Sequence, residues 1–361
     1  MGLDLSALIS VKQGFLELVI TYIQILTLFF TSFFVVAALT PWMRKIAIKT
    51  NFVDHPTAAH KSHVEAMPYL GGVAIIIGTL GVTYGAILSQ ENMRDNFWIA
   101  TSLFGPALIL GIVGLIDDRK ALSPLPRFIA QSAAGIFTAT LIIATDTVGN
   151  PAGNSALDAA ITIVWIVGIS NSINFFDNLD GGAAGAVAAT SLGLFLITQS
   201  NGQYLISASA ITIFAAMLGF LIWNKSPAKI YMGDAGALFL GTVIAVLTIR
   251  LNPEVESKTL SFAVPLLLLA VPILDTSVAV VSRIRRKRSI FQGGHDHLSH
   301  RLMRQGFSKR QSAYALWSLA GIFAGIATTI ATSETDSIFL VSLSAVFWIT
   351  LFVTFLKSED E

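Results

Sequence analysis

Long apolar stretches of about twenty residues alternate with short polar connections along almost the whole chain. A helix of that length crosses a hydrocarbon core of about 30 Å. The pattern therefore predicts an all-α, polytopic integral membrane protein with about eleven transmembrane helices. The expected spans are residues 15–40, 70–89, 97–116, 127–145, 157–173, 183–199, 203–223, 235–251, 260–282, 313–332 and 336–356.

The connections are short except for residues 41–69 and 283–312, which leaves no room for a separate soluble domain. We therefore expect residues 1–361 to form a single transmembrane domain. The first apolar run is too long for the core of a cleavable signal peptide and lacks a basic segment before it. The chain has no cysteine, which excludes disulfides, and its net charge of +1 gives no reason to expect a nucleic-acid partner.

Basic residues predict the orientation, because connections rich in Lys and Arg stay on the cytoplasmic side. With the N-terminus outside and the C-terminus inside, 19 of the 23 Lys and Arg residues face the cytoplasm and four face outward. The same arrangement places every aspartate of the candidate motifs at the cytoplasmic ends of the spans. The cytoplasmic side of the protein is thus expected to hold the functional site, whereas the outer side carries ordinary polar loops.

The polar segment NSINFFDNLDGG, Asn171–Gly182, lies between two apolar runs. Asn171, Asn174, Asp177 and Asp180 recur every three residues, so neighbours share a helix face or the turn that ends it. Turn-forming residues at a helix end explain Asp180, Gly181 and Gly182. They do not explain two asparagines inside the apolar helix, and polar groups at a membrane edge favour a functional site.

Two further segments carry carboxylates at span ends. Asp117 and Asp118 follow a span directly, and two adjacent acids need a nearby cation, for which Arg119 and Lys120 are candidates, or a raised pKa. Asp234 opens a span in the segment KIYMGDAGALFLG, where it is either an N-cap or a ligand. Mg²⁺ prefers one or two carboxylates or carbonyls, with water and phosphate completing its shell, and Asn174 with Asp234 would suit it.

Histidine and basic residues gather in the two long inner connections. The first holds His60, Lys61 and His63, and the second holds a basic run that is most simply a membrane anchor. After that run, the residues typical of a phosphate-binding loop are His295, His297, His300 and Arg301. A zinc site is less favoured, since closed zinc sites usually include cysteine or a separated pair of ligands. Carboxylates, Mg²⁺ and phosphate donors on one face together predict phosphoryl-group transfer.

The ordered set of motifs resembles the polyprenyl-phosphate N-acetylhexosamine-1-phosphate transferases, the group of MraY and WecA. The resemblance covers nearly the whole chain and includes Lys61–His63, Asp117–Asp118, Asn171–Gly182, IYMGD, VPILD and HLSHRL. The VPILDT segment before a basic run is closer to the WecA branch, which transfers N-acetylglucosamine 1-phosphate to undecaprenyl phosphate.

The resemblance implies a Mg²⁺-dependent transfer of an N-acetylhexosamine 1-phosphate from a UDP-sugar to a polyprenyl phosphate, the first membrane step of a cell-envelope glycan pathway. N-acetylglucosamine is the favoured sugar. Asn174 and Asp234 would hold Mg²⁺, whereas the catalytic candidates are Asp117 as base or orienter, Asp118 as its support, and Asp177 and Asp180 as orienters of nucleotide or sugar. The substrate-binding candidates are Lys61, His63, Asn171, Asp275, His295, His297, His300 and Arg301.

Two positions depart from the family pattern. Ser299 replaces the middle histidine of the His-rich motif, and His60 precedes Lys61 where arginine is expected. These departures leave the sugar open. The oligomeric state is open as well, with a homodimer as one option. A secondary transporter of an anionic substrate is the alternative function, and it would place charged residues near the bilayer midplane in an internal repeat, which we do not find.

Overall fold

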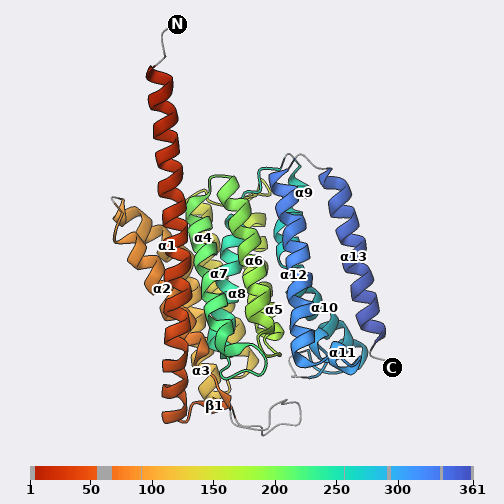
Figure 1. Ribbon diagram of the computed structural model, residues 1–361. Helices are drawn as coiled ribbons and strands as arrows, with labels where there is room; N and C mark the ends of the chain where they lie inside the picture. Colours follow the sequence, from red (N-terminus) through yellow and green to blue (C-terminus); the bar gives the residue numbers. More distant parts are fainter. Residues whose placement is uncertain are drawn as a thin grey trace.

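The computed structural model describes residues 5–54, 67–90, 92–255, 257–290, 294–333 and 336–358, with side chains of the first helix from residue 21 onward. The described chain is almost entirely helical (Figure 1), as predicted, and one short antiparallel sheet pairs β1 with β2. The elements are α1 Leu5–Lys49, β1 Val53–Asp54, β2 Met67–Pro68, α2 Gly71–Ile87, α3 Met93–Lys120, α4 Pro124–Ala144, α5 Ser155–Phe176, α6 Gly182–Ser200, α7 Tyr204–Asn224, α8 Gly233–Arg250, α9 Lys258–Leu268, α10 Ala270–Arg285, α11 Leu298–Arg304, α12 Lys309–Thr332 and α13 Ser337–Lys357.

The number of spans is smaller than predicted, although the multi-pass membrane architecture is confirmed. Within the described chain, nine helices are long and apolar enough to cross a membrane, and the bent pair α9–α10 makes a tenth. The expected span that does not meet these criteria is the second one, residues 70–89, which forms the 17-residue helix α2. That length is at the lower limit for crossing a bilayer, which requires about twenty residues.

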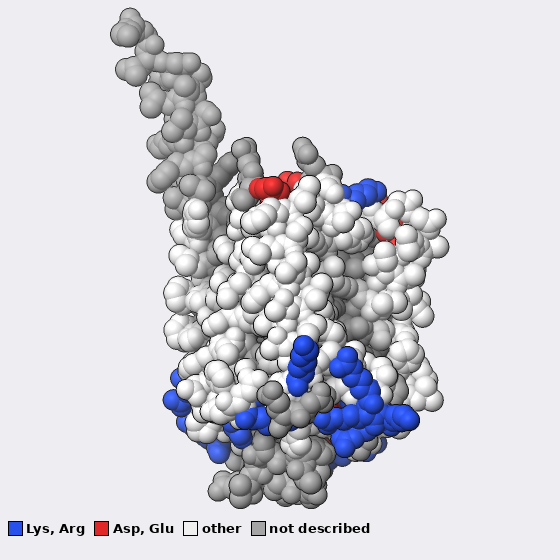
Figure 2. Space-filling view, turned by 90° about the vertical axis from the view of Figure 1, so that its right-hand side faces the viewer, with Lys and Arg blue, Asp and Glu red and all other residues white. Residues whose placement is uncertain are grey.

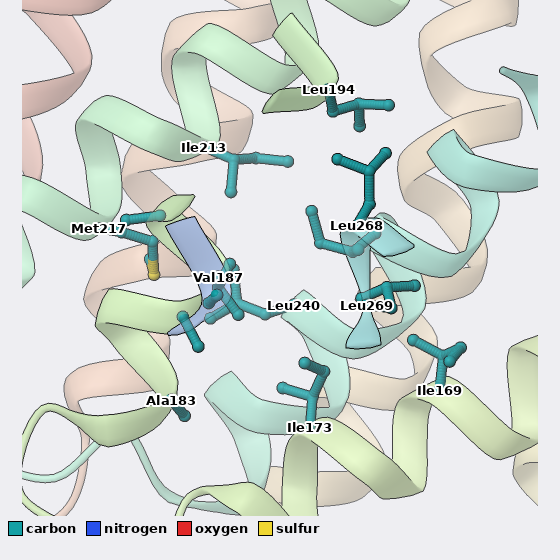
Figure 3. Close-up of a cluster of buried hydrophobic side chains, with 14 of the residues drawn as sticks. Ile169, Ile173, Ala183, Val187, Leu194, Ile213, Met217, Leu240, Leu268 and Leu269 are labelled. Atoms are coloured by element: carbon teal, nitrogen blue, oxygen red, sulfur yellow. The ribbon is translucent and has the colours of Figure 1, made fainter. Parts of the chain in front are cut away.

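Helix α8 forms the centre of the bundle, in contact with α2, α3 and α5. Its apolar stretch is 83% buried, compared with 6% for α13 at the edge. Aliphatic side chains from α5 to α9 close around it in one continuous core, which Figure 3 shows with Ile173, Val187, Met217 and Leu240 among its members. Among the candidate membrane helices of the described chain, α8 is thus the most deeply buried.

The predicted span 260–282 is broken at Leu269, where α9 and α10 meet at an angle of 76°. Pro272 explains the break, because its ring would clash with the carbonyl of Leu268 in a continuous helix. The freed carbonyls still need donors inside a membrane. Thr190 Oγ1 donates to the freed Leu268 carbonyl at 2.7 Å. Trp348 Nε1 of α13 adds a bond to the Ala270 carbonyl, in the first turn of α10, at 3.0 Å.

Charged side chains separate toward the two ends of the bundle. Figure 2 shows Lys and Arg gathered at the end where α11 lies, while the opposite end of the same face carries acidic residues and few cations. The described N-terminal part of α1 and the C-terminus lie at opposite ends (Figure 1). The ends of the helices that carry the candidate motifs, including α3, α5 and α10, lie at the basic end.

Candidate active site

The last turn of α3 places the two adjacent acids in different surroundings. Asp117 is buried, and its Oδ2 accepts from Arg127 Nη1 at 2.7 Å while its Oδ1 accepts from the Leu122 amide at 2.6 Å. The cation that balances this carboxylate is therefore Arg127, at the start of α4. The neighbouring candidates Arg119 and Lys120 form no ion pair with either acid within the described residues, and Arg119 instead lies over the ring of Phe52.

Asp118 binds the start of α8 rather than a cation. Its Oδ1 accepts from the Asp234 amide at 2.9 Å, and its Oδ2 accepts from the Ala235 amide at 3.2 Å. These amides belong to the first turn of α8, where no carbonyl of the helix itself can reach them. The N-cap expected of Asp234 is thus provided by Asp118, which fixes the end of α3 to the start of α8.

The geometry of this junction depends on glycine. Gly233 has φ = +68°, a left-handed conformation that turns the chain into α8, and a Cβ there would lie 2.6 Å from Asp118 Oδ2. On α3, a Cβ at Gly114 would lie 2.4 Å from the Asp234 carbonyl oxygen. The two helices therefore approach so closely that only hydrogen atoms fit at these two positions.

The two predicted metal ligands lie side by side. Asn174 Nδ2 donates to Asp234 Oδ1 at 2.7 Å, and Asp234 Oδ2 lies 3.5 Å from Arg127 Nη1. Arg127 therefore connects Asp117 with Asp234, and the side chains of α3, α4, α5 and α8 meet at one point. We call the group formed by Asp117, Arg127, Asn174 and Asp234 the carboxylate cluster.

The carboxylate cluster fits Mg²⁺ better than a metal with an all-protein shell. Within the described residues, no three His, Cys, Asp or Glu side chains converge as a metal-binding group. Mg²⁺ commonly uses one or two carboxylates and takes its remaining ligands from water and substrate phosphates. Asp117 and Asp234, already sharing one cation, supply such a pair, and Asn174 holds the second carboxylate in place.

Asp177 and Asp180 have separate environments. Burial, followed by the charges of Asp234 and Asp180, raises the pKa of Asp177 to about 7, and its carboxylate forms no hydrogen bond with another described residue. Asp180 is buried and accepts from the Ala228 amide at 3.1 Å and from the Tyr231 hydroxyl at 3.3 Å. Asp180 thus holds the segment that leads into α8, while Asp177 remains free for a ligand among the described groups.

Asn171 has a partner that sequence reasoning missed. Its Nδ2 donates to Gln131 Oε1 of α4 at 2.7 Å, and Gln131 Nε2 returns a bond to Asn171 Oδ1 at 3.3 Å. Asn171 also donates to the Val167 carbonyl at 2.7 Å. This pair ties α4 to α5 beside the carboxylate cluster. Gln131 carried no motif, and only its polarity inside an apolar span would have indicated it.

Asp275 and His297 form the centre of a second buried network. Asp275 is fully buried, and its carboxylate accepts from His297 Nδ1 at 2.7 Å and from the Leu298 amide at 2.7 Å. Arg283 Nη2 lies 3.3 Å from His297 Nε2, and Arg283 Nε donates to Asp296 at 3.1 Å. Since arginine can only donate, His297 Nε2 accepts and Nδ1 carries the proton. Asp275, predicted to bind substrate, therefore fixes the ring of His297.

The other predicted loop residues are a pair of neighbouring histidines, His295 and His300, and the buried Arg301. His295 is exposed and its Nδ1 lies 3.5 Å from that of His300, and the Ser299 hydroxyl donates to the side-chain oxygen of Asn178. Arg301 has a different position from that expected, because its guanidinium is fully buried and donates to the carbonyls of Asp296 and Phe355. Lys61 and His63 lie outside the described residues.

His300 gives a prediction about acid stability. Burial, followed by the neighbouring His295 and His297, lowers the pKa of His300 to about 4. The unfolded side chain takes up its proton near pH 6.5. Stability is therefore complete above about pH 6.5 and decreases as the pH falls toward 4, because only the unfolded chain binds the proton. Between pH 7.5 and pH 5, we expect the thermal midpoint in detergent to fall further for wild type than for His300→Gln. Parallel curves for the two proteins would contradict this assignment.

Comparison with known proteins agrees with the chemistry of this site. Residues 100–252 match the protein family described as "Glycosyl transferase family 4". The chain is 34% identical over 341 residues to a probable undecaprenyl-phosphate N-acetylglucosaminyl 1-phosphate transferase of Bacillus subtilis, covering 92% of this chain and 89% of that protein. It is 32% identical to the decaprenyl-phosphate N-acetylglucosaminephosphotransferase of Mycolicibacterium smegmatis, covering 81% of this chain and 78% of that protein. A phospho-N-acetylmuramoyl-pentapeptide-transferase of Streptococcus agalactiae is 30% identical over only 52% of this chain and 60% of its own length.

Proposed function

The chain belongs to glycosyl transferase family 4, and from this premise we propose that it transfers N-acetylglucosamine 1-phosphate from UDP-N-acetylglucosamine to a polyprenyl phosphate. The resemblance inferred from the motifs is thereby confirmed at the level of the family. The lipid acceptor is undecaprenyl phosphate or a close relative, and the product is a polyprenyl diphospho-sugar that begins a cell-envelope glycan. The two similar N-acetylglucosamine 1-phosphate transferases align with 92% and 81% of the chain, whereas the phospho-N-acetylmuramoyl-pentapeptide-transferase aligns with 52%. This difference supports N-acetylglucosamine 1-phosphate as the transferred group.

The reaction exchanges one phosphoanhydride linkage for another. An oxygen of the lipid phosphate attacks the β-phosphorus of the UDP-sugar, and the bond between that phosphorus and the bridging oxygen breaks. UMP leaves with the electron pair of that bond. Little covalent chemistry is required of the protein, because positioning and charge stabilisation account for most of the catalysis in phosphoryl transfer.

The carboxylate cluster provides the positioning. Asp117 and Asp234 would hold Mg²⁺ together with the phosphates, and the ion would stabilise charge that develops on the diphosphate. Both carboxylate oxygens of Asp117 already accept hydrogen bonds, which supports a role as orienter over one as general base. Asp177 faces the same group of charges without a described partner, and we assign it to the nucleotide or the sugar. His295 and His300 extend the site toward the phosphates.

The observation that carries this proposal is the meeting of Asp117, Asp234 and Asn174, from three different helices, at the basic end of a membrane bundle. A transporter would instead be expected to carry its charged residues near the midplane on interrupted helices. Purified protein should release UMP from UDP-N-acetylglucosamine only when both Mg²⁺ and polyprenyl phosphate are present. A panel of UDP-sugars identifies the preferred donor. Substrate uptake by proteoliposomes without UMP release would favour the transporter.

The membrane orientation gives a prediction of its own. The excess of Lys and Arg at one end supports a cytoplasmic position for that end, with the N-terminus outside and the C-terminus inside the cell membrane. Reporter fusions should therefore find Ser289 on the cytoplasmic side and Asn150 on the outer side. The UDP-sugar and the carboxylate cluster would then both be on the cytoplasmic side. A reporter at Ser289 that is active outside the cell would contradict the orientation and the access of a soluble nucleotide sugar to the site.

A further inference from the structure

Arg127 is the cation that neutralises Asp117, a role for which the sequence had suggested Arg119 and Lys120. It lies in the first turn of α4, and one of its nitrogens, Nη1, is 2.7 Å from Asp117 Oδ2 and 3.5 Å from Asp234 Oδ2. A single positive group thus lies between two carboxylates contributed by different helices. Without it, the two negative charges would repel each other at short range.

The remaining oxygens of the two carboxylates have other partners. Asp117 Oδ1 accepts from the Leu122 amide and Asp234 Oδ1 accepts from Asn174, so in each case Oδ2 is the oxygen that faces Arg127. No other cation in the described part of the chain forms an ion pair with either residue. Asp118 does not compete for Arg127, since its oxygens accept from the backbone of α8.

The guanidinium is held mainly by these two acids. The side chain of Arg127 is 30% exposed and that of Asp234 is 32% exposed, so water and ions can reach the pair. Arg127 also lies at the N-terminal end of α4, where the helix dipole disfavours a cation. Among the described residues, no other acid therefore holds the guanidinium in place once the two carboxylates are neutralised.

We infer that Arg127 is a resident counter-ion that occupies the position of the divalent cation between Asp117 and Asp234, that metal binding displaces it, and that the displaced guanidinium then binds a phosphate of the nucleotide. The inference rests on the proposed function only in taking that cation to be the metal of the transferase site. A guanidinium presents two parallel N–H donors to phosphate, which makes it a better phosphate ligand than an ammonium. The same side chain thus has two alternative anionic partners.

The first experiment measures metal binding without any substrate. Mn²⁺ serves as the probe, and its dissociation constant is determined by electron paramagnetic resonance on the full chain in detergent. Arg127→Gln removes the competing cation, and we expect it to bind Mn²⁺ about tenfold more tightly than wild type, as suits loss of one charge-assisted ion pair. Arg119→Gln is the matched control. It removes a nearby cation, in the last turn of α3, whose guanidinium lies over the Phe52 ring and forms no ion pair with Asp117 or Asp234. Equal or weaker Mn²⁺ binding by Arg127→Gln would overturn the inference.

The second experiment measures UDP binding at saturating Mn²⁺ with the same proteins. Arg127→Gln should bind UDP about tenfold more weakly than wild type, because the displaced guanidinium is missing. Tighter metal binding with weaker nucleotide binding is a pair of opposite effects that general damage to the site cannot produce. Unchanged UDP affinity would overturn the phosphate-binding half of the inference.

A conservative variant covers the case in which Arg127→Gln does not fold. Arg127→Lys keeps the charge on a shorter and more strongly hydrated side chain, so it competes less well with the metal. We expect its Mn²⁺ affinity to lie between those of wild type and the glutamine variant, and an affinity at or below that of wild type would overturn the inference. Neither titration needs sugar or lipid. A protein that shows these effects but releases no UMP would therefore disprove the proposed function and leave the counter-ion role intact.

Discussion

Asp234→Asn is expected to lower the rate of UMP release by about 10²–10³-fold without unfolding the protein. Asparagine has nearly the same shape and can still accept the hydrogen bond that Asn174 gives to Oδ1. It cannot supply the negative charge that binds Mg²⁺, so charge developing on the diphosphate would be poorly stabilised. Steady-state UMP release across a Mg²⁺ titration, with thermal unfolding as the measure of folding, checks this expectation.

Asp158→Asn provides the matched control for this substitution. Asp158 is a buried aspartate near the opposite end of α5 from Asn174, and it accepts from the Ala152 amide at 2.7 Å. It shares burial and hydrogen bonding with Asp234 but lies outside the carboxylate cluster, so its loss should hardly change turnover. If Asp234→Asn also keeps near-normal turnover and an unchanged Mg²⁺ dependence, Asp234 is not a metal ligand.

Gly114→Ala should lower activity by about 10²-fold although it adds a single methyl group and removes no charge. In an isolated helix this change would be favourable by about 0.5–1 kcal/mol. Here the new Cβ would lie 2.4 Å from the Asp234 carbonyl oxygen and 2.6 Å from the Ala235 amide nitrogen, so α3 and α8 must move apart. That movement displaces Asp234 from Asp117 and weakens the bonds that Asp118 makes to the start of α8.

The same helix contains the control for this prediction. A Cβ at Gly105 would meet only Thr101 Cγ2, at 3.9 Å, which is an ordinary contact. Gly105→Ala should therefore keep full activity, with the gain in helix propensity as its main effect. Kinetic constants for the two variants, measured with the same donor and lipid, separate the effects. Equal activities would mean that the close approach of α3 and α8 does not control the position of Asp234.

The sequence could predict the helices and the end of the bundle at which the polar groups meet. Hydrophobic length identifies a membrane helix, and alternating crossings bring every second connection to the same side. These two rules sufficed to bring Asp117, Asn174 and Asp234 to one end. The sequence also identified Asp234 as the start of a helix, because it precedes an apolar run and lies between Gly233 and Gly236.

The partners of these residues could not be predicted in the same way. Asp117 pairs with Arg127 because Leu122 closes the turn between α3 and α4, and sequence proximity instead suggested Arg119. Asp118 resembled a second catalytic acid, yet its environment is decided by α8, more than a hundred residues later. The break between α9 and α10 also depends on tertiary structure, since the donor at its first free carbonyl comes from Thr190 of α6.

The polar contacts of α13 make the order of synthesis important for assembly in the membrane. Although only 6% of its apolar stretch is buried, α13 supplies Trp348 to the Ala270 carbonyl beside the bend, and its Phe355 carbonyl accepts from the buried Arg301. Because α13 follows α9, α10 and α11 in the chain, it leaves the ribosome after them. Until then, Thr190 can already donate to the Leu268 carbonyl at the bend and Arg301 can already donate to Asp296 and Ser282, but both sites lack their contact with α13. The two segments can therefore complete these contacts only after α13 has been synthesised, so deletion of residues 337–358 should weaken the packing of both.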